Sequence, residues 1–170
     1  MKKILIIDTG GTFNKVYNPI TGDLDIDTTG VAIKSITKNW LIELTFINII
    51  GKDSLDMVDN DREKILQTIQ SSNCKSIIVI HGTDTIDKTA QYLLNVKMDR
   101  EIILTGAMVP FSINPIEATA NLTSAYGYLQ KLEQNGLYIA LNGIINFYNR
   151  VKKNREKGKF EETMVYKNKF

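Results

Sequence analysis

Short apolar runs rich in β-branched residues recur along this chain and alternate with helix-type patterns. The runs lie at residues 3–7, 44–50, 76–80, 101–104 and 137–141, and the helix-type patterns at residues 31–40, 59–71, 86–95 and 115–135. Apolar runs of this length are typical of buried strands. Strands that alternate with helices predict parallel βαβ units with helices on both faces of the sheet. We therefore expect an α/β fold: a three-layer, doubly wound domain, flavodoxin-like or Rossmann-like, with a mainly parallel sheet.

The remaining segments carry turn or edge signals. Residues 14–32 contain several turn dipeptides and predict a hairpin-like excursion. Asn142-Gly143 predicts a tight turn into a further strand at residues 144–147. Gly136 is expected to end the long helix before it, because glycine accepts the left-handed C-terminal position. The tail at residues 164–170 alternates weakly and is interpreted as an edge strand.

Length and composition limit the classes of protein. The 170 residues suit one domain with one substantial core, and a formal net charge of +2 gives no argument for nucleic acid or an anionic membrane. With a single cysteine, Cys74, no intramolecular disulfide can form. The single histidine, His81, excludes a multi-histidine metal site. Only four apolar residues follow Met1-Lys2-Lys3, too few for a signal-peptide core, so we expect a cytoplasmic protein.

Three of the expected strands end in turns rich in threonine and glycine. These turns are Thr9-Gly10-Gly11-Thr12, Gly82-Thr83-Asp84-Thr85 and Thr105-Gly106-Ala107. In open α/β sheets, ligands bind just beyond the carboxyl ends of the strands, and parallel strands open at the same edge. The three turns together therefore predict a site. A GxGxxG loop does not follow the first strand, which disfavours a dinucleotide. The chain also has no Walker loop, so phosphate chemistry has no support beyond the fold.

The residue types in these turns favour acyl transfer. The sequence has no G-x-S-x-G elbow for a Ser-His-Asp arrangement. A threonine hydroxyl is a weak nucleophile and needs a base, and a lysine whose pKa is lowered by burial can serve when a carboxylate orients it. The basic segment at residues 148–159, interpreted either as a solvated loop or as part of the site, offers Lys152 or Lys153. Backbone amides of the Gly11 or Gly82 turns can stabilise an oxyanion.

The ordered set of motifs resembles the L-asparaginase family. The motifs are Thr9-Gly10-Gly11-Thr12, His81-Gly82-Thr83-Asp84-Thr85 and Leu104-Thr105-Gly106-Ala107-Met108, and Asp53-Ser54-Leu55-Asp56-Met57 is similar to the family's substrate-binding loop. The resemblance covers residues 3 to about 153. It implies an amidohydrolase that converts L-asparagine to L-aspartate and ammonia through a threonine nucleophile, with no metal and no organic cofactor. Whether L-glutamine is also a substrate stays open.

The resemblance implies a role for each matching catalytic residue. Thr12 matches the nucleophile, and Tyr17 matches the loop tyrosine that orients or activates it. Thr83 matches the second catalytic threonine, and Asp84 the aspartate that binds the substrate's α-amino group. Lys153, rather than Lys152, best matches the lysine that is hydrogen-bonded to the second threonine.

The resemblance also implies a substrate-binding set, and His81 is interpreted as structural. The set is Gly11, Ser54, Leu55, Gly82, Thr83, Asp84 and Ala107. Ser54 falls on the carboxylate-binding serine, whereas Leu55 stands where the family usually has a polar residue that contacts the substrate.

Residues 1–170 are expected to form a single asparaginase N-terminal-type domain without the family's usual C-terminal domain. We expect a small-molecule substrate, a homo-oligomer, and neither nucleic acid nor membrane as a partner. Two alternatives stay open. One is a non-catalytic amino-acid-binding or interaction domain on the same scaffold. The other is an amidohydrolase that acts on another amide, and its only support is the basic segment at residues 150–159.

Overall fold

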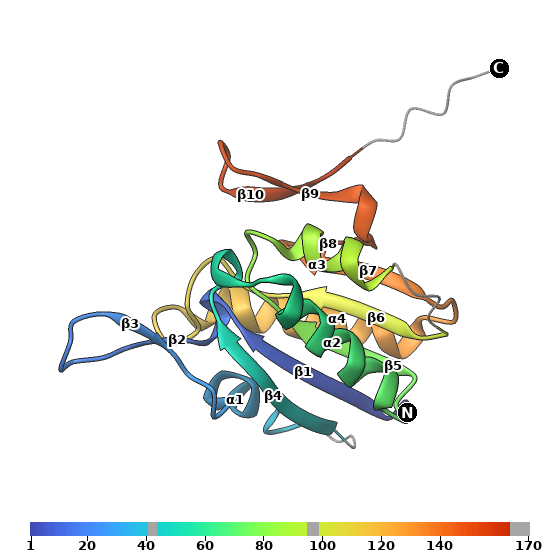
Figure 1. The fold of residues 1–170 in the computed structure, drawn as a ribbon, viewed down its shortest axis with the longest axis horizontal. Helices are drawn as coiled ribbons and strands as arrows, with labels where there is room; N and C mark the ends of the chain where they lie inside the picture. Colours follow the sequence, from blue (N-terminus) through green and yellow to red (C-terminus); the bar gives the residue numbers. More distant parts are fainter. Residues whose placement is uncertain (41–43, 95–98, 164–170) are drawn as a thin grey trace.

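The computed structural model describes residues 1–40, 44–94 and 99–163 (Figure 1). The expected tail strand at 164–170 and the end of the expected helix at 86–95 lie outside the described residues. The main sheet contains, in spatial order, β4 (Leu44–Lys52), β1 (Ile4–Gly10), β5 (Ser76–Ile80), β6 (Glu101–Thr105), β7 (Gly136–Leu141) and β8 (Ile144–Phe147). The first five are parallel, and β8 pairs antiparallel with β7.

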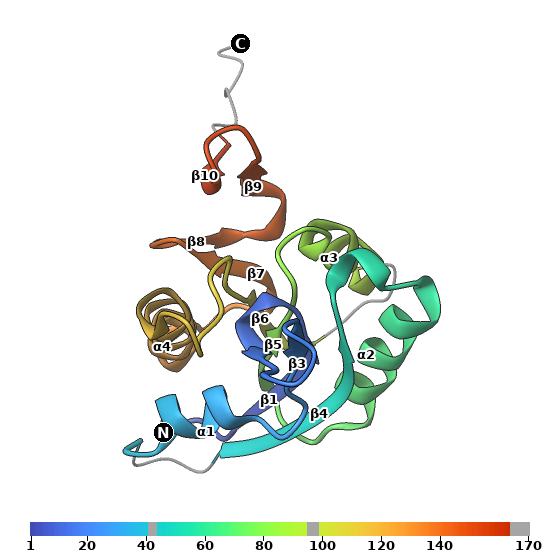
Figure 2. The same ribbon diagram turned by 90° about the vertical axis from the view of Figure 1, so that its left-hand side faces the viewer.

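Helices cover both faces of this sheet (Figure 2). On one face lie α1 (Val31–Thr37) and α4 (Pro115–Lys131), and on the other α2 (Asp59–Ser71) and α3 (Ile86–Leu93). Numbered by their order in the chain, the five parallel strands have the order 2-1-3-4-5, which is that of flavodoxin-like sheets. The predicted three-layer, doubly wound, mainly parallel fold is therefore confirmed.

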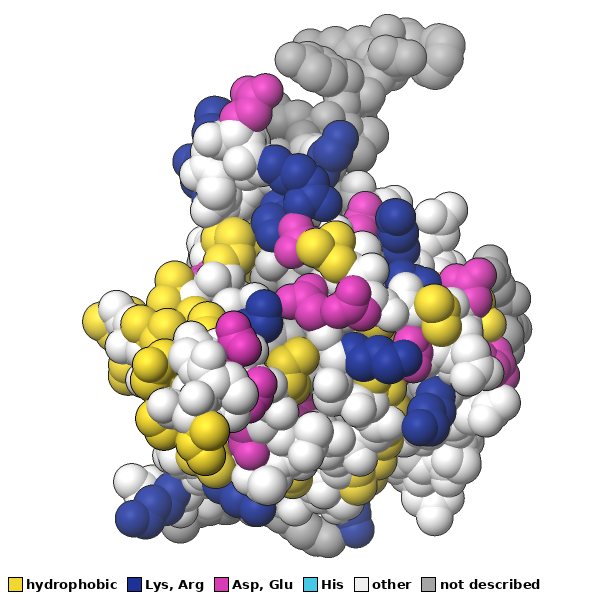
Figure 3. Space-filling model, turned by 60° about the vertical axis from the view of Figure 1, so that its left-hand side comes forward, with side chains coloured by type: hydrophobic (Ala, Val, Ile, Leu, Met, Phe, Trp, Pro, Cys, Tyr) yellow, Lys and Arg dark blue, Asp and Glu magenta, His cyan; other side chains and the backbone are white. Residues whose placement is uncertain are grey.

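Two hairpins project from this body (Figure 1). β2 (Lys15–Tyr17) pairs with β3 (Leu24–Ile26), which agrees with the predicted excursion. β9 (Val151–Asn154) pairs with β10 (Lys159–Glu162), so the basic segment is a hairpin rather than a loop. Figure 3 shows Lys and Arg side chains gathered at the height of this second hairpin, next to a group of Asp and Glu side chains.

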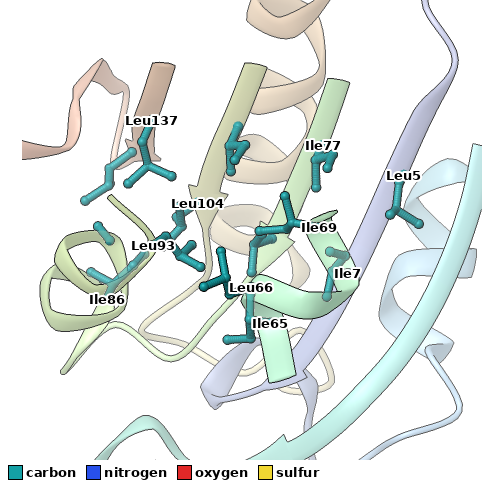
Figure 4. Packing of buried hydrophobic residues seen from close by; sticks show 14 of the residues in the cluster. Leu5, Ile7, Ile65, Leu66, Ile69, Ile77, Ile86, Leu93, Leu104 and Leu137 are labelled. Carbon is teal, nitrogen blue, oxygen red and sulfur yellow. The ribbon is translucent and has the colours of Figure 1, made fainter. Parts of the chain in front are cut away.

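The strands bury both of their faces, and this explains their continuous apolar composition. Leu5 and Ile7 of β1 face the cluster under α2 and α3, whereas Ile4 and Ile6 face the cluster under α1 and α4. Figure 4 shows the first cluster, where leucines and isoleucines of the sheet meet those of the two helices. This packing makes the sheet a rigid platform for the turns at its carboxyl edge.

Turns and helix ends agree only in part with the sequence-based predictions. Asn142 (φ 50°) and Gly143 (φ 80°) both have positive φ, so the tight turn between β7 and β8 is confirmed. The prediction that Gly136 ends the long helix was wrong, because α4 ends at Lys131 and Gly136 begins β7. The chain leaves the helix at Leu132, which takes extended angles and buries its side chain in the cluster under α1 and α4. Among the described residues, no helix combines the length and the apolar character that crossing a membrane requires.

Candidate functional site

The turns after β1 and β5 touch at the carboxyl edge of the sheet, at the point where the strand order reverses. Gly11 has φ 78°, and a Cβ on it would lie 2.5 Å from the Cα of Gly82. Only glycine fits at Gly11, because a side chain would both strain the backbone and collide with the neighbouring turn. This reversal of strand order is the switch point at which flavodoxin-like sheets bind their ligands. The fold thus provides a ligand-binding location here.

A third segment closes the site beside Gly82. The short 3₁₀ helix η2 (Ser54–Asp56) follows β4, and the Thr85 hydroxyl donates a hydrogen bond to the Ser54 carbonyl oxygen over 2.8 Å. A Cβ on Gly82 would lie 2.6 Å from the Cβ of Ser54. Ser54 is 1% exposed, and its hydroxyl has no hydrogen-bond partner within the described structure. A buried hydroxyl without a partner costs about 1–3 kcal/mol, so Ser54 is a free donor at this edge.

Thr12 begins the 3₁₀ helix η1 (Thr12–Asn14) immediately after Gly11 and is half-buried. The turn before it is fastened to the neighbouring strand, because the buried Thr9 hydroxyl donates to the Ile80 carbonyl oxygen over 2.8 Å. Thr9 therefore acts on the backbone, and its hydroxyl is not free for chemistry. Of the two hydroxyls in this turn, Thr12 is the one available to a ligand.

The buried carboxylate of Asp8 stabilises the same turn through hydrogen bonds. Its carboxylate accepts hydrogen bonds from the Gly10 N–H at 3.1 Å, the Asn14 side chain at 2.6 Å and the Asn48 side chain at 2.9 Å. Burial raises the pKa of Asp8, although these three hydrogen bonds oppose the change. Because Gly10 and Asn14 flank Thr12 in the sequence, the Asp8 network fixes the backbone on both sides of that residue.

Lys153 reaches the turn after β5 from the second hairpin. Its amine lies 2.8 Å from the Thr83 hydroxyl and 2.9 Å from Asp84 Oδ1. The Lys153 side chain is 17% exposed, so this pair is partly shielded from water. Neighbouring side chains on a strand point to opposite sides, and Lys152 is exposed to solvent. The structure therefore brings Lys153, and not Lys152, to Thr83 and Asp84.

Arg155 also contacts Asp84, and sequence reasoning missed it. Its Nη1 lies 2.5 Å from Asp84 Oδ1, and its Nη2 donates to the Asp84 carbonyl oxygen over 3.1 Å. Partial burial opposes ionisation of Asp84, but the hydrogen bonds from Lys153 and Arg155 outweigh it and hold the pKa of this carboxyl below its usual value. Arg155 lies two residues after Lys153, in the turn that follows β9, and this short separation within the basic segment is the signal that could have revealed it.

A second missed pair connects the first hairpin to the site. Lys15 on β2 lies 2.7 Å from Asp53 Oδ2, and Asp53 Oδ1 accepts from the Leu55 N–H at 3.2 Å. Burial alone would raise the pKa of Asp53, but the hydrogen bonds from Lys15 and Leu55 outweigh it and lower that pKa. The ion pair thus ties β2 to η2 beside Ser54.

Three expected site residues make weaker contributions to the geometry. Tyr17 lies on β2, is 62% exposed and, within the described residues, donates no hydrogen bond. Leu55 is 68% exposed on η2. Ala107 is fully buried in the cluster under α1 and α4, which leaves only its backbone for a ligand.

His81 is buried between the turn and α3. Because the Gly82 carbonyl oxygen can only accept, the His81 Nδ1–H donates to it over 2.7 Å, and Nε2 accepts from the Thr89 hydroxyl over 2.8 Å. Burial lowers the pKa of His81 to about 4. A neutral ring with both nitrogens occupied agrees with the structural role expected from the sequence.

Two cavities lie at the second hairpin, and the smaller one reaches residues of the candidate site. A cavity of about 120 Å³ lies between the start of α3 and β9, and Thr83, Asp84 and Lys153 line part of it. A larger hollow of about 510 Å³ lies on the β9–β10 hairpin, away from the β1 turn. Within residues 1–40, 44–94 and 99–163, no three His, Cys, Asp or Glu side chains are grouped as metal ligands.

Fold and site together define a class: a flavodoxin-like α/β domain with threonine, carboxylate and lysine groups at its switch point. The family model described as "Asparaginase, N-terminal" matches residues 3–160, and the chain belongs to this family. The resemblance inferred from the sequence motifs is therefore confirmed.

Three known proteins are similar to the chain over most of its length. A probable periplasmic L-asparaginase of Haemophilus influenzae is 31% identical over 156 residues, which are 84% of this chain and 43% of that protein. The L-asparaginase of Thermococcus kodakarensis superimposes with a TM-score of 0.80 at 24% identity, over 94% of this chain and 51% of that one. A probable cytoplasmic L-asparaginase of Campylobacter jejuni superimposes with a TM-score of 0.79 at 26% identity, over 95% and 53%. The chain thus spans about half the length of these relatives.

Proposed function

We propose that the chain is an amidohydrolase that converts L-asparagine to L-aspartate and ammonia, with Thr12 as the nucleophile. One observation carries the proposal: the Lys153 amine lies 2.8 Å from the Thr83 hydroxyl and 2.9 Å from Asp84 Oδ1. This lysine, threonine and carboxylate stand at the edge of the sheet where the Gly11 turn meets Gly82. A hydroxyl with a lysine beside it can carry a proton to or from a reacting group, which is the role that this proposal gives to Thr83 and Lys153.

In this proposal the charged ends of the substrate bind first. The Asp84 carboxylate pairs with the α-ammonium group, and the free Ser54 hydroxyl donates to the α-carboxylate. Gly11 and Gly82 let the two turns and Ser54 pack closely together, because a Cβ on either glycine would collide with its neighbour, and this packing gathers the backbone N–H groups at one place. The side-chain amide of asparagine then lies beside Thr12.

The reaction proceeds by two acyl transfers. The Thr12 oxygen adds to the amide carbon while backbone N–H groups of the glycine turns stabilise the oxyanion. The carbon–nitrogen bond breaks, and the departing nitrogen takes up the proton from the Thr12 hydroxyl and leaves as ammonia. The acyl group stays on the Thr12 oxygen as an ester. Water then hydrolyses this ester, with Thr83 and Lys153 moving the proton, and releases L-aspartate. Tyr17 is proposed to orient or activate Thr12, and the residues themselves supply every proton transfer.

An ammonia-release assay with L-asparagine tests the proposal. The wild-type protein should release ammonia, and Thr12→Ala should reduce the rate roughly 10³-fold or more because the nucleophile is lost. Thr123→Ala is the matched control, since Thr123 is an exposed threonine of α4. Release no faster than that of Thr12→Ala would reject the proposal. L-glutamine belongs in the same assay, because one methylene in a pocket discriminates by only ~1–3 kcal/mol.

A second candidate is an amino-acid-binding domain without turnover. The observation that favours it is Leu55, an exposed apolar side chain next to the proposed carboxylate-binding Ser54. Calorimetry with L-aspartate discriminates the two candidates: binding without ammonia release from L-asparagine supports the binding domain.

We also propose a homo-oligomer, which light scattering tests directly. A cytoplasmic location stays a prediction, since one similar protein is called cytoplasmic and another periplasmic.

A further inference from the structure

Asp84 holds two cations through a single oxygen. The Lys153 amine lies 2.9 Å from Asp84 Oδ1, and Arg155 Nη1 lies 2.5 Å from the same atom. Arg155 adds a second contact, since its Nη2 donates to the Asp84 carbonyl oxygen over 3.1 Å. One negative and two positive charges leave this cluster with a net charge of +1. Such a cluster repels any further cation that approaches it.

The two cations differ in how firmly they are held. Lys153 is 17% exposed and is held a second time by the Thr83 hydroxyl. Arg155 is 62% exposed, and both of its hydrogen bonds go to Asp84. Exposed ion pairs are weak, because water solvates the separated charges well. Arg155 is therefore the cation that an incoming group can displace into solvent.

We propose that Arg155 is a specificity-determining residue, which neutralises the ammonium-binding carboxylate of Asp84 and competes with the α-ammonium group of an amino acid for it. The proposal rests on the proposed function, in which Asp84 accepts the substrate's ammonium group. A ligand that has the same carboxylate and side-chain carboxyl or amide group, but no ammonium group, does not compete with Arg155 for Asp84. Arg155 thus reduces the preference for ω-amides that carry an α-ammonium group over those that lack it. Deamino ω-amides, such as succinamate, are then a second substrate class.

Calorimetry with L-aspartate and succinate tests this inference without depending on turnover. The two ligands share their carboxylates and differ in the ammonium group, so the ratio of their affinities reports on that group alone. In Arg155→Gln, the ratio of aspartate affinity to succinate affinity should rise about threefold over wild type, within the range of an exposed ion pair. Loss of the positive charge weakens the attraction for the carboxylates that the two ligands share, and this part of the change cancels in the ratio.

Lys157→Gln provides the matched control. Lys157 lies in the turn of the same hairpin, is 59% exposed and pairs with Glu161 at 2.9 Å. This variant removes one positive charge from the hairpin without touching Asp84. The affinity ratio in Lys157→Gln should therefore equal that of the wild-type protein.

An unchanged or lower ratio of aspartate affinity to succinate affinity in Arg155→Gln would overturn the inference. An equal rise of this ratio in Lys157→Gln would overturn it too. So would the failure of both ligands to bind to wild type and to Arg155→Gln. The proposed function fails separately, when wild type releases no ammonia from L-asparagine. In that case the affinity ratios still decide the role of Arg155, because they require binding only.

Discussion

The Lys153 amine donates a hydrogen bond to the Thr83 hydroxyl over 2.8 Å, although 70 residues separate the two along the chain. Thr83 follows a central strand of the sheet, whereas Lys153 comes from a hairpin beyond its edge. The hairpin is anchored by Val151 and Phe160, which are buried in the cluster under α2 and α3. This anchoring turns a basic surface segment into part of the candidate site.

Replacing this lysine should remove activity with little effect on substrate binding. In Lys153→Gln, kcat for L-asparagine should fall about 10²–10⁴-fold, the usual contribution of a general acid or base. Its KM should change far less, because the proposed binding contacts belong to Asp84 and Ser54. Steady-state ammonia release measures both constants.

The neighbouring lysine is the control for that variant. Lys152 is exposed on the other side of the same strand, so Lys152→Gln removes the same charge without touching Thr83. Its kcat should stay within about twofold of wild type, the usual range of surface substitutions. Equal losses in both variants would show that the hairpin's charge, rather than the contact with Thr83, supports the activity.

The contact between Gly11 and Gly82 predicts a large difference between two glycine substitutions. Gly11 and Gly22 have nearly the same φ, 78° and 80°, but only Gly11 is crowded: its added Cβ would lie 2.5 Å from the Cα of Gly82. Gly22 has nothing within 4 Å of its added Cβ. Gly22→Ala should cost about 1–2 kcal/mol of unfolding free energy, the penalty for left-handed backbone.

Gly11→Ala should cost about 1–3 kcal/mol more than Gly22→Ala, because it adds overpacking to the backbone strain. Urea unfolding of both variants measures the difference. Equal losses would mean that the two turns separate at little cost and that the close approach is unimportant for stability.

The sheet was predictable because each central strand buries both faces and therefore needs a continuous apolar run. Ser76–Ile80 shows this directly, since all its residues are buried and its bounds equal the predicted ones. The site's location followed from the same rule, because parallel strands end at one edge. The end of α4 was not predictable, because burial of Leu132 outweighs the preference of Gly136 for a helix end.

The second hairpin could not be read from local sequence. Its strands are short and rich in charge, and its apolar anchors, Val151 and Phe160, act through contacts with the distant α2 and α3 cluster. Arg155 was missed for the same reason, since its partner Asp84 is far away in the chain. Pairing between distant segments decides these features, and local propensity carries little information about it.

The ion pairs of Asp84 predict how its contribution to stability depends on pH. The pKa of Asp84 lies below its ordinary value of 3.8 in the folded protein, so folding favours the ionised carboxylate. Its stabilisation is complete well above pH 3.8 and disappears as the pH falls through the lower folded pKa. Wild type should therefore be more stable than Asp84→Asn at pH 6, and this difference should shrink below pH 3.8.

Urea unfolding at a series of pH values measures this difference. Asp56→Asn is the control, because Asp56 is exposed and has no cationic partner among the described residues. The stability difference between wild type and Asp56→Asn should vary much less over the same pH range. A constant difference for Asp84→Asn would show that Lys153 and Arg155 contribute no net stability through this carboxylate.

His81 predicts a second pH dependence, in a different window. Burial lowers its pKa from 6.5 to about 4, so the unfolded chain binds a proton more tightly than the folded one between these values. The stabilisation is complete above pH 6.5 and is lost as the pH falls towards 4. Within this window the unfolding free energy falls by about 1.4 kcal/mol for each pH unit, which gives a total loss of about 3 kcal/mol.

His81→Gln removes this titration, and His81 is the single histidine of the chain, so no other imidazole obscures the result. Carboxylates that titrate near pH 4 contribute to both proteins and cancel in the comparison. The unfolding free energy of wild type should therefore fall more steeply between pH 6.5 and 5 than that of His81→Gln. NMR titration of the ring protons gives an independent measurement. A folded-state pKa of His81 near 6.5, together with parallel stability curves, would contradict the burial of the ring and its hydrogen bonds with Gly82 and Thr89. A ring that is accessible to water would protonate in its usual range.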